Sequence, residues 1–237
     1  MRSLFLLLLT AVASAQSPTV GRKVVWEDQF NGSAVDGAKW NVGNPDLVKV
    51  EKGKLVLGFQ QTPGGFVGGN LNTSGKFAQQ FGYFEASIRF NAFQGHRGTF
   101  GIRSEKQEEL PSAAMKFDGA GLDRIFPWGR FANTQGSRDA QPPKWDGILT
   151  GGKGYKRFNE YGILWSEKSV AWFLEGKKVM EVERSDSFAP VSVFLAHGDV
   201  ESDKKHRGIR NFAGENYVAV PVQGYDHVLV DWVKIWK

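Results

Sequence analysis

The sequence predicts an all-β protein, built as a sandwich of antiparallel sheets. Short apolar or alternating runs recur along the chain, and Gly, Asn, Asp and Pro separate them. No segment keeps a helical periodicity, and only residues 45–47 and 184–188 suggest short turns. Many short strands with turn residues between them are typical of β-sandwiches.

Five runs are the clearest predicted strands, and each is short and rich in apolar side chains. They are residues 54–59, 82–90, 169–174, 191–195 and 228–236. Residues 175–178 read Glu-Gly-Lys-Lys and are predicted to form the tip of a hairpin that joins the third run to residues 179–182.

Large aromatic side chains in the apolar runs are the predicted core. Trp40, Trp165 and Trp172 all lie in such segments. Glu85 is a charged residue inside an apolar strand, and its simplest interpretation is a solvent-facing position or a pair with Arg89.

The first fifteen residues have the three parts of a secretory signal peptide. Arg2 precedes the apolar run 4–9, and Ala-Ser-Ala at 13–15 ends the segment with small residues. This run is far shorter than the ~20 apolar residues that span a bilayer, and no later segment supplies them. We therefore expect residues 1–15 to be removed and the protein to be secreted, periplasmic or extracellular, without a membrane span.

Residues 16–237 are predicted to form one domain, because sandwiches of about 200–250 residues are often single units. The chain has no cysteine, which excludes thiol catalysis and cysteine-bound metals. Its formal net charge is +5, but the basic residues are scattered along the sequence, so no nucleic acid partner is expected. We expect a monomer.

Four stretches in order along the chain carry a family resemblance. They are residues 25–32 with 39–41, residues 75–77 with 81–89, residues 160–165 with 170–176, and residues 230–235. In this order they resemble glycoside hydrolase family 16, the group of laminarinases, lichenases and agarases. The resemblance implies a concanavalin A-like jelly roll whose concave sheet holds a polysaccharide, a β-glucan or a galactan.

The family places its catalytic carboxylates on one strand, as Glu-x-Asp-x-Glu or with one extra residue at a bulge. Alternate residues of a strand point to one face, which aims all three at the cleft. Residues 113–121 are the best match. Without a bulge the nucleophile, helper and acid/base positions are Ala114, Lys116 and Asp118; with a bulge they are Ala113, Met115 and Asp118. A third alignment, on residues 121–126, keeps only Asp123.

Each alignment loses the carboxylate pair that a retaining glycosidase needs. An alanine cannot form the glycosyl-enzyme intermediate, and a lysine beside Asp118 favours the ionised form that cannot donate a proton. The expectation is a catalytically degenerate, polysaccharide-recognising protein. One alternative is an active endo-β-glycanase that uses Asp118 with Glu105, Asp123 or Asp146, or a nucleophile supplied by the substrate. Another is a structural or protein-binding jelly roll without a sugar ligand.

Candidate sugar-binding residues follow the catalytic strand, in the segment that lines the cleft in the family. Trp128 and Trp145 lie among Pro, Gly and polar residues, where an exposed indole can stack on a sugar ring. Packing within a loop is the alternative for both. Arg130 and Asn133 can bond hydroxyl or acidic groups of a glycan.

The resemblance also implies a structural calcium ion. Asp231 on the final strand and a backbone carbonyl near Gly53 match the positions that hold it in the family. A capped or paired surface acid is the alternative for Asp231. The four histidines show no paired spacing on a shared element, so zinc catalysis is not expected.

Overall fold

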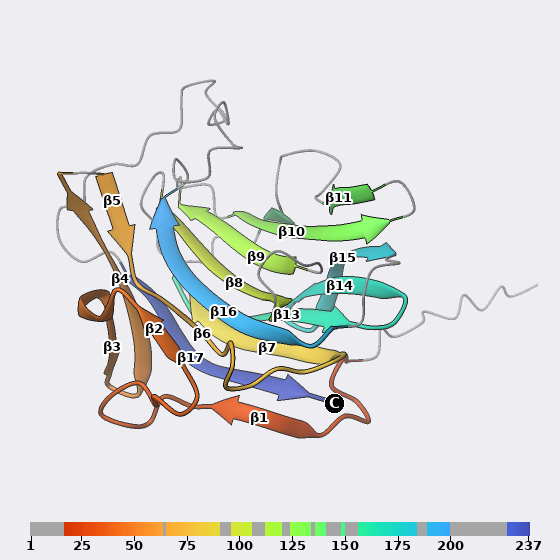
Figure 1. The fold of residues 1–237 in the computed structure, drawn as a ribbon, viewed down its shortest axis with the longest axis horizontal. Helices are drawn as coiled ribbons and strands as arrows, with labels where there is room; N and C mark the ends of the chain where they lie inside the picture. The colour runs from red at the N-terminus through yellow and green to blue at the C-terminus, as the bar shows by residue number, and fades with distance from the viewer. Residues whose placement is uncertain are drawn as a thin grey trace, which may run out of the picture.

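Two antiparallel sheets face each other in the computed structural model of the chain (Figure 1). The structure describes residues 17–63, 65–90, 96–105, 112–119, 124–133, 136–140, 148–149, 156–183, 189–199 and 227–237. In this part of the chain the one helical element is the short 3-10 turn η1, Pro45–Leu47. The prediction of an all-β sandwich is confirmed. None of the described helical segments has the length and apolar character needed to cross a membrane.

The larger sheet contains nine strands among the described residues and is called the nine-stranded sheet. They are β1 (Val24–Asp28), β3 (Val48–Glu51), β4 (Lys54–Thr62), β5 (Gly65–Gly68), β7 (Gly82–Arg89), β13 (Asn159–Trp165), β14 (Ser169–Leu174), β15 (Lys177–Glu183) and β17 (His227–Trp236). The order is β15-β14-β13-β7-β17-β4-β3, with β1 beside β17 and β5 beside β4.

The second sheet contains eight described strands and is called the eight-stranded sheet. They are β2 (Asn41–Gly43), β6 (Asn70–Asn72), β8 (His96–Ser104), β9 (Ser112–Gly119), β10 (Arg124–Asn133), β11 (Gly136–Ala140), β12 (Ile148–Leu149) and β16 (Val191–Asp199). The order is β11-β10-β9-β8-β16-β6-β2, with β12 beside β10.

Alternating side chains of both sheets fill the space between them. On β7, Phe84, Ala86 and Ile88 are fully buried, and they belong to one core cluster with residues of β8 and β16. Burial of a large apolar side chain contributes about 1.5–3 kcal/mol, so this shared core holds the sheets together. The three predicted core tryptophans, Trp40, Trp165 and Trp172, are at most 1% exposed.

The predicted hairpin is present between β14 and β15. Glu175 and Gly176 form its turn with positive φ values of 52° and 69°. Two successive positive φ angles suit a two-residue hairpin, because they match the twist of the flanking strands. The other predicted turn, at 184–188, lies outside the described residues, whereas that at 45–47 is η1.

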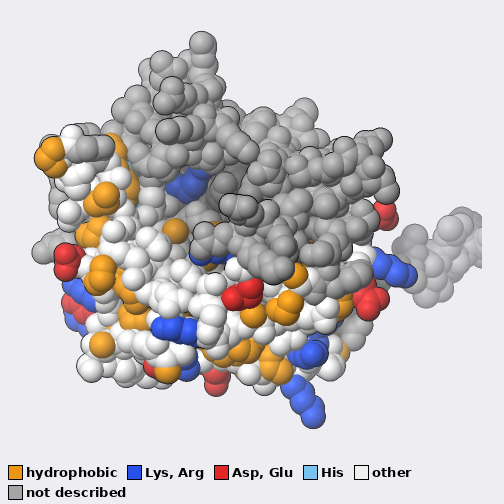
Figure 2. Space-filling view, viewed as in Figure 1, with side chains coloured by type: hydrophobic (Ala, Val, Ile, Leu, Met, Phe, Trp, Pro, Cys, Tyr) orange, Lys and Arg blue, Asp and Glu red, His pale blue; other side chains and the backbone are white. Residues whose placement is uncertain are grey.

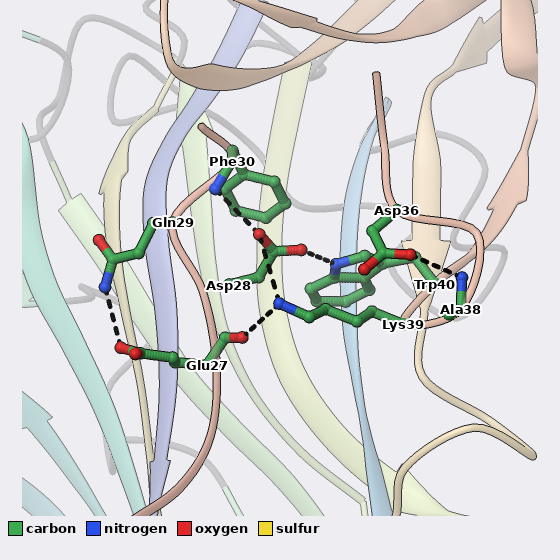
Figure 3. A network of polar contacts seen from close by, with 8 residues as sticks. All are labelled: Glu27, Asp28, Gln29, Phe30, Asp36, Ala38, Lys39 and Trp40. Atoms are coloured by element: carbon green, nitrogen blue, oxygen red, sulfur yellow. Dashed lines mark hydrogen bonds and ion pairs between the residues drawn. The ribbon is translucent and has the colours of Figure 1, made fainter. Parts of the chain in front are cut away.

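A buried carboxylate fixes the segment that follows β1 (Figure 3). Asp28 accepts hydrogen bonds from the Trp40 indole Nε1 at 2.8 Å and from the Phe30 backbone N–H at 2.9 Å. Lys39 Nζ donates to the Glu27 backbone carbonyl at 2.8 Å and lies 4.0 Å from Asp28 Oδ1. The first of the four family-like stretches therefore has a structural role: its hydrogen bonds hold Trp40 in the core.

Candidate functional site

One face of the eight-stranded sheet lies in the core, and the opposite one is called the candidate face. On β8, Phe100 and Ile102 are fully buried in the core cluster. Arg97, Thr99, Gly101 and Arg103 alternate with them, so they belong to the candidate face. β16 follows the same pattern, with Ser192, Phe194 and Ala196 on this face opposite the core residues Val191, Val193 and Leu195.

The register of β9 distinguishes the two alignments of the catalytic motif. Ala113 is fully buried in the core cluster. β9 pairs with β8 and with β10 without a register shift, so the strand contains no bulge. Positions 114, 116 and 118 therefore fall on the candidate face, in agreement with the unbulged alignment.

Basic residues flank Asp118 on both neighbouring strands. Asp118 is directly opposite Arg97 of β8 and Arg124 of β10. Directly opposed residues have their Cβ atoms about 4.5–5.5 Å apart, a separation at which opposite charges stabilise each other. The position that the family reserves for a proton donor thus lies between two arginine positions in the register.

An aromatic ring and a guanidinium group form the best-defined feature of the candidate face. A Cβ atom added to Gly101 would lie 2.6 Å from the Phe194 ring, so this ring covers Gly101. The Arg103 guanidinium carbon lies 5.5 Å from the centre of the same ring. Gly101 pairs with Ala114, which places the Phe194 ring beside the position that the unbulged alignment assigns to the nucleophile.

The predicted sugar-binding residues on β10 do not all share one face. Ile125, Pro127 and Gly129 are buried, so positions 128 and 130 belong to the candidate face. Trp128 is directly opposite Ala114. Asn133 has the parity of the buried positions, so a regular β10 does not bring it to the face of Trp128. Trp145 lies outside the described residues.

Glu105 is too far from Asp118 to act as its catalytic partner. Arg97, opposite Asp118, and Glu105 lie near opposite ends of β8. Eight residues of strand span about 26 Å, whereas an inverting glycosidase needs its carboxyls about 6.5–9.5 Å apart. Glu105 Oε2 instead accepts from the Gly75 backbone N–H at 2.9 Å. Asp123 and Asp146 lie outside the described residues.

The proposed calcium ligand forms an ion pair. Asp231 Oδ1 accepts from Lys54 Nζ at 2.6 Å, and Gly53 adopts a left-handed turn with φ of 71° beside it. Calcium takes about six to eight oxygen ligands. Among the described residues no group of three or more His, Cys, Asp or Glu could hold a metal ion. The Lys54 ammonium group thus occupies one oxygen of the carboxylate that the resemblance assigns to calcium.

Glu85 is buried on the outward side of the nine-stranded sheet, contrary to its predicted solvent-facing position or pairing with Arg89. It is 6% exposed and accepts a hydrogen bond from the Tyr83 hydroxyl at 2.9 Å. Burial raises the pKa of Glu85 to about 7, and the Tyr83 hydrogen bond opposes this shift. Burial and the neighbouring Glu85 also raise the pKa of the Tyr83 hydroxyl. The group lies across the core from the candidate face.

Sequence reasoning missed Arg97, Arg103 and Phe194 as members of the candidate face. Phe194 lies in a predicted strand between the apolar residues Val193 and Leu195. Strand alternation alone would have placed it on the face opposite to theirs, which is the candidate face. Nothing in the sequence shows that this face is shared with Arg103, because the pairing of β16 with β8 joins distant segments.

Comparisons with known proteins agree with the geometry of the sheets. SCLam, a non-specific endo-beta-1,3(4)-glucanase, superposes with a TM-score of 0.74 at 17% identity, over 94% of each chain. The laminarinase of Flavobacterium sp. UMI-01 superposes with a TM-score of 0.70 at 18% identity, over 91% of this chain and 100% of that one. At these identities the likeness is one of fold.

Sequence comparison identifies the same group. Glucan endo-1,3-beta-glucosidase A1 of Niallia circulans is 21% identical over 213 residues, and the match covers 70% of this chain and 30% of that protein. The family model described as glycosyl hydrolases family 16 matches residues 36–200. The resemblance found in the sequence is thus confirmed, and the chain belongs to glycosyl hydrolase family 16.

Proposed function

We propose that the protein is a secreted, catalytically degenerate member of this family, which binds a β-linked polysaccharide along the candidate face. The relatives named above are glucanases and a laminarinase, which supports a β-glucan, with a galactan as the second choice. Binding without hydrolysis is the central claim.

The observation that carries this proposal is the register of β9. Positions 114, 116 and 118 lie on the candidate face in a strand without a bulge, and they hold Ala, Lys and Asp. A retaining glycosidase needs two carboxyls about 5–5.5 Å apart, one of them as nucleophile. The single carboxylic acid among these positions cannot act as both nucleophile and proton donor.

Sugar binding does not need those carboxylates. The Phe194 ring offers an apolar surface next to position 114, and Trp128 occupies the register position directly opposite it. Aromatic faces hold sugar rings by stacking, and the neighbouring polar groups bond the hydroxyls. We therefore expect the aromatic positions to bind a sugar although the carboxylate pair is absent.

The test measures binding and hydrolysis together. The purified protein is incubated with laminarin, lichenan, agarose and carrageenan, new reducing ends are assayed, and affinity electrophoresis reports binding. We expect at least one glycan to bind without new reducing ends. Phe194→Ala and Trp128→Ala should weaken binding, whereas Trp232→Ala, on the nine-stranded sheet, should not.

Two results would contradict the proposal in different ways. Turnover that disappears in Asp118→Asn would establish the active endo-β-glycanase. An absence of binding to every glycan would favour the structural or protein-binding alternative.

Secretion is tested separately from binding. The expected leader, residues 1–15, lies outside the described residues. N-terminal sequencing of the exported protein should begin at Gln16. Detection of the uncleaved chain in the cytoplasmic fraction alone would contradict this part of the proposal.

A further inference from the structure

We infer that the polysaccharide recognised by the candidate face is anionic, carrying sulfate or carboxylate groups. This inference rests on the proposed function, and within it favours a charged galactan or a polymer of acidic sugars over a neutral β-glucan. It follows from the charges that the sheet brings to this face, from one guanidinium–aromatic pair, and from the contrast with the opposite side of the molecule.

The described strands place five basic residues and two acidic ones at candidate-face positions. The basic ones are Arg97 and Arg103 on β8, Lys116 on β9, and Arg124 and Arg130 on β10; the acidic ones are Asp118 on β9 and Asp139 on β11. In the register, Asp118 is opposite Arg97 and Arg124, and Asp139 is opposite Arg130, so each acidic position has a basic position directly opposite it. Arg103 and Lys116 have no acidic residue directly opposite them in the register.

The remaining strands of this sheet add no charge to the face. β16 contributes Ser192, Phe194 and Ala196, and β6 contributes Asn70 and Asn72. The basic residues of the described strands are therefore concentrated at positions of three adjacent strands, which lie about 4.8 Å apart. A concave or recessed surface of one sign raises the local concentration of an oppositely charged ligand. Figure 2 shows Lys and Arg side chains at the hollow in one surface of the molecule.

Arg103 and Phe194 supply a matched pair of contacts. The guanidinium carbon lies 5.5 Å from the ring centre, and the ring covers Gly101 in the middle of the sheet. A sugar ring that stacks on Phe194 would place its substituents beside Arg103. Guanidinium groups bind sulfate-like and carboxylate groups through two parallel hydrogen bonds, a geometry that a neutral hydroxyl cannot reproduce.

The outward face of the nine-stranded sheet has a different charge pattern. Its described positions include Glu27, Glu85, Glu160 and Glu181 together with Lys178 and Lys234. Lys234 Nζ lies 4.6 Å from the centre of the Trp232 ring. This second cation–aromatic pair lies on a face that has both acidic and basic residues. It provides a matched control for Arg103 and Phe194.

The experiment compares glycans that differ only in charge. Carrageenan and the same preparation after chemical desulfation are titrated into the full-length protein by calorimetry, with alginate as a carboxylate polymer and laminarin as a neutral one. We expect the charged polymers to bind at least about tenfold more tightly than the neutral ones. Their affinity should fall as salt rises from about 50 to about 500 mM, because exposed charges are screened.

Four variants show which residues cause the effect. Arg103→Gln should weaken binding of the charged polymer by about tenfold and reduce the salt dependence, while Arg103→Lys should retain part of the affinity. Lys116→Gln is a second test on a neighbouring strand, should Arg103→Gln fail to fold. Lys234→Gln, which removes the same charge on the other sheet, should bind like wild type.

The outcomes separate this inference from the proposed function. Equal affinity for carrageenan and its desulfated form would overturn the anionic ligand while leaving polysaccharide binding in place. No binding to any polymer would overturn the proposed function itself. Tighter binding of a single-stranded oligonucleotide than of every charged glycan would overturn the inference in favour of a nucleic acid.

Discussion

Glu85 shows how one residue can set the pH dependence of stability. Its carboxyl group is buried beside Tyr83, and a Cβ atom at Gly162 would lie 2.0 Å from the Tyr83 hydroxyl, so the tyrosine ring lies against that glycine. The pKa of Glu85 rises from 4.5 to about 7 on folding, chiefly through burial. Between these values the folded state keeps a proton that the unfolded state has released, so the free energy of unfolding falls as pH rises.

Glu85→Gln should remove this loss of stability. Glutamine is neutral and can still accept the Tyr83 hydrogen bond, so near pH 4 the variant should match wild type. At pH 8 it should be more stable by up to about 3 kcal/mol, because one pKa unit corresponds to about 1.4 kcal/mol. Urea unfolding at both pH values measures the difference. Glu183→Gln, at an exposed position of β15, is the control. Equal pH profiles of stability for Glu85→Gln and wild type would show that folding does not raise the pKa of Glu85.

The ion pair between Lys54 and Asp231 leads to a prediction about calcium. Because Asp231 already holds the Lys54 ammonium group at 2.6 Å, calcium or a chelator should change the melting temperature of the wild-type protein by less than about one degree. Thermal unfolding with excess calcium and with EDTA makes this comparison. A rise of several degrees with calcium, lost in Asp231→Asn, would restore the calcium site that the family resemblance implies.

At the scale of an element, β8 serves two functions through its two faces. One face supplies the core residues Phe100 and Ile102, and the other supplies Arg97 and Arg103 to the candidate face. Glycines create space on both sides. A Cβ atom at Gly98 would lie 2.1 Å from the Phe90 ring in the core. Aromatic rings thus contact this strand at the two glycines, where a side chain is absent.

Gly98→Ala should destabilise the protein by about 1–3 kcal/mol, because the added methyl group overpacks the core against Phe90. The midpoint of urea unfolding measures this loss. Gly198→Ala is a suitable control, since a Cβ atom there would meet nothing within 4 Å. An unchanged midpoint for Gly98→Ala would mean that Phe90 can move away without cost.

At the scale of the whole molecule, the core separates two polar regions. Glu85 lies on the outward side of one sheet and Arg103 on the candidate face of the other. Stacked sheets are about 10 Å apart, and residues at such separations without shared contacts have nearly additive effects.

We therefore expect Glu85→Gln and Arg103→Gln to act independently. The double variant should show the sum of the two stability changes within about 0.5 kcal/mol. Its glycan affinity should equal that of Arg103→Gln alone. Calorimetric titrations and urea unfolding of the four proteins form the cycle, and a larger coupling would show that the two faces communicate through the core.

The sequence by itself determined the strands and the core, because alternation and apolar clustering are local. It predicted β14 at its observed bounds, the hairpin at Glu175 and Gly176, and the burial of Trp40. It also showed that alanine replaces the family's nucleophile in both of its main alignments of the catalytic strand.

Tertiary structure alone decided the rest, because strand pairing joins distant segments. Ser192 and Arg103 are 89 positions apart, yet they are partners in one sheet. Only that pairing brings Phe194 over Gly101 beside Arg103. Only the packing of Ala113 into the core distinguishes the two alignments of β9. Only the packing of the folded chain shows that Glu85, which the sequence suggests is exposed, is buried beside Tyr83.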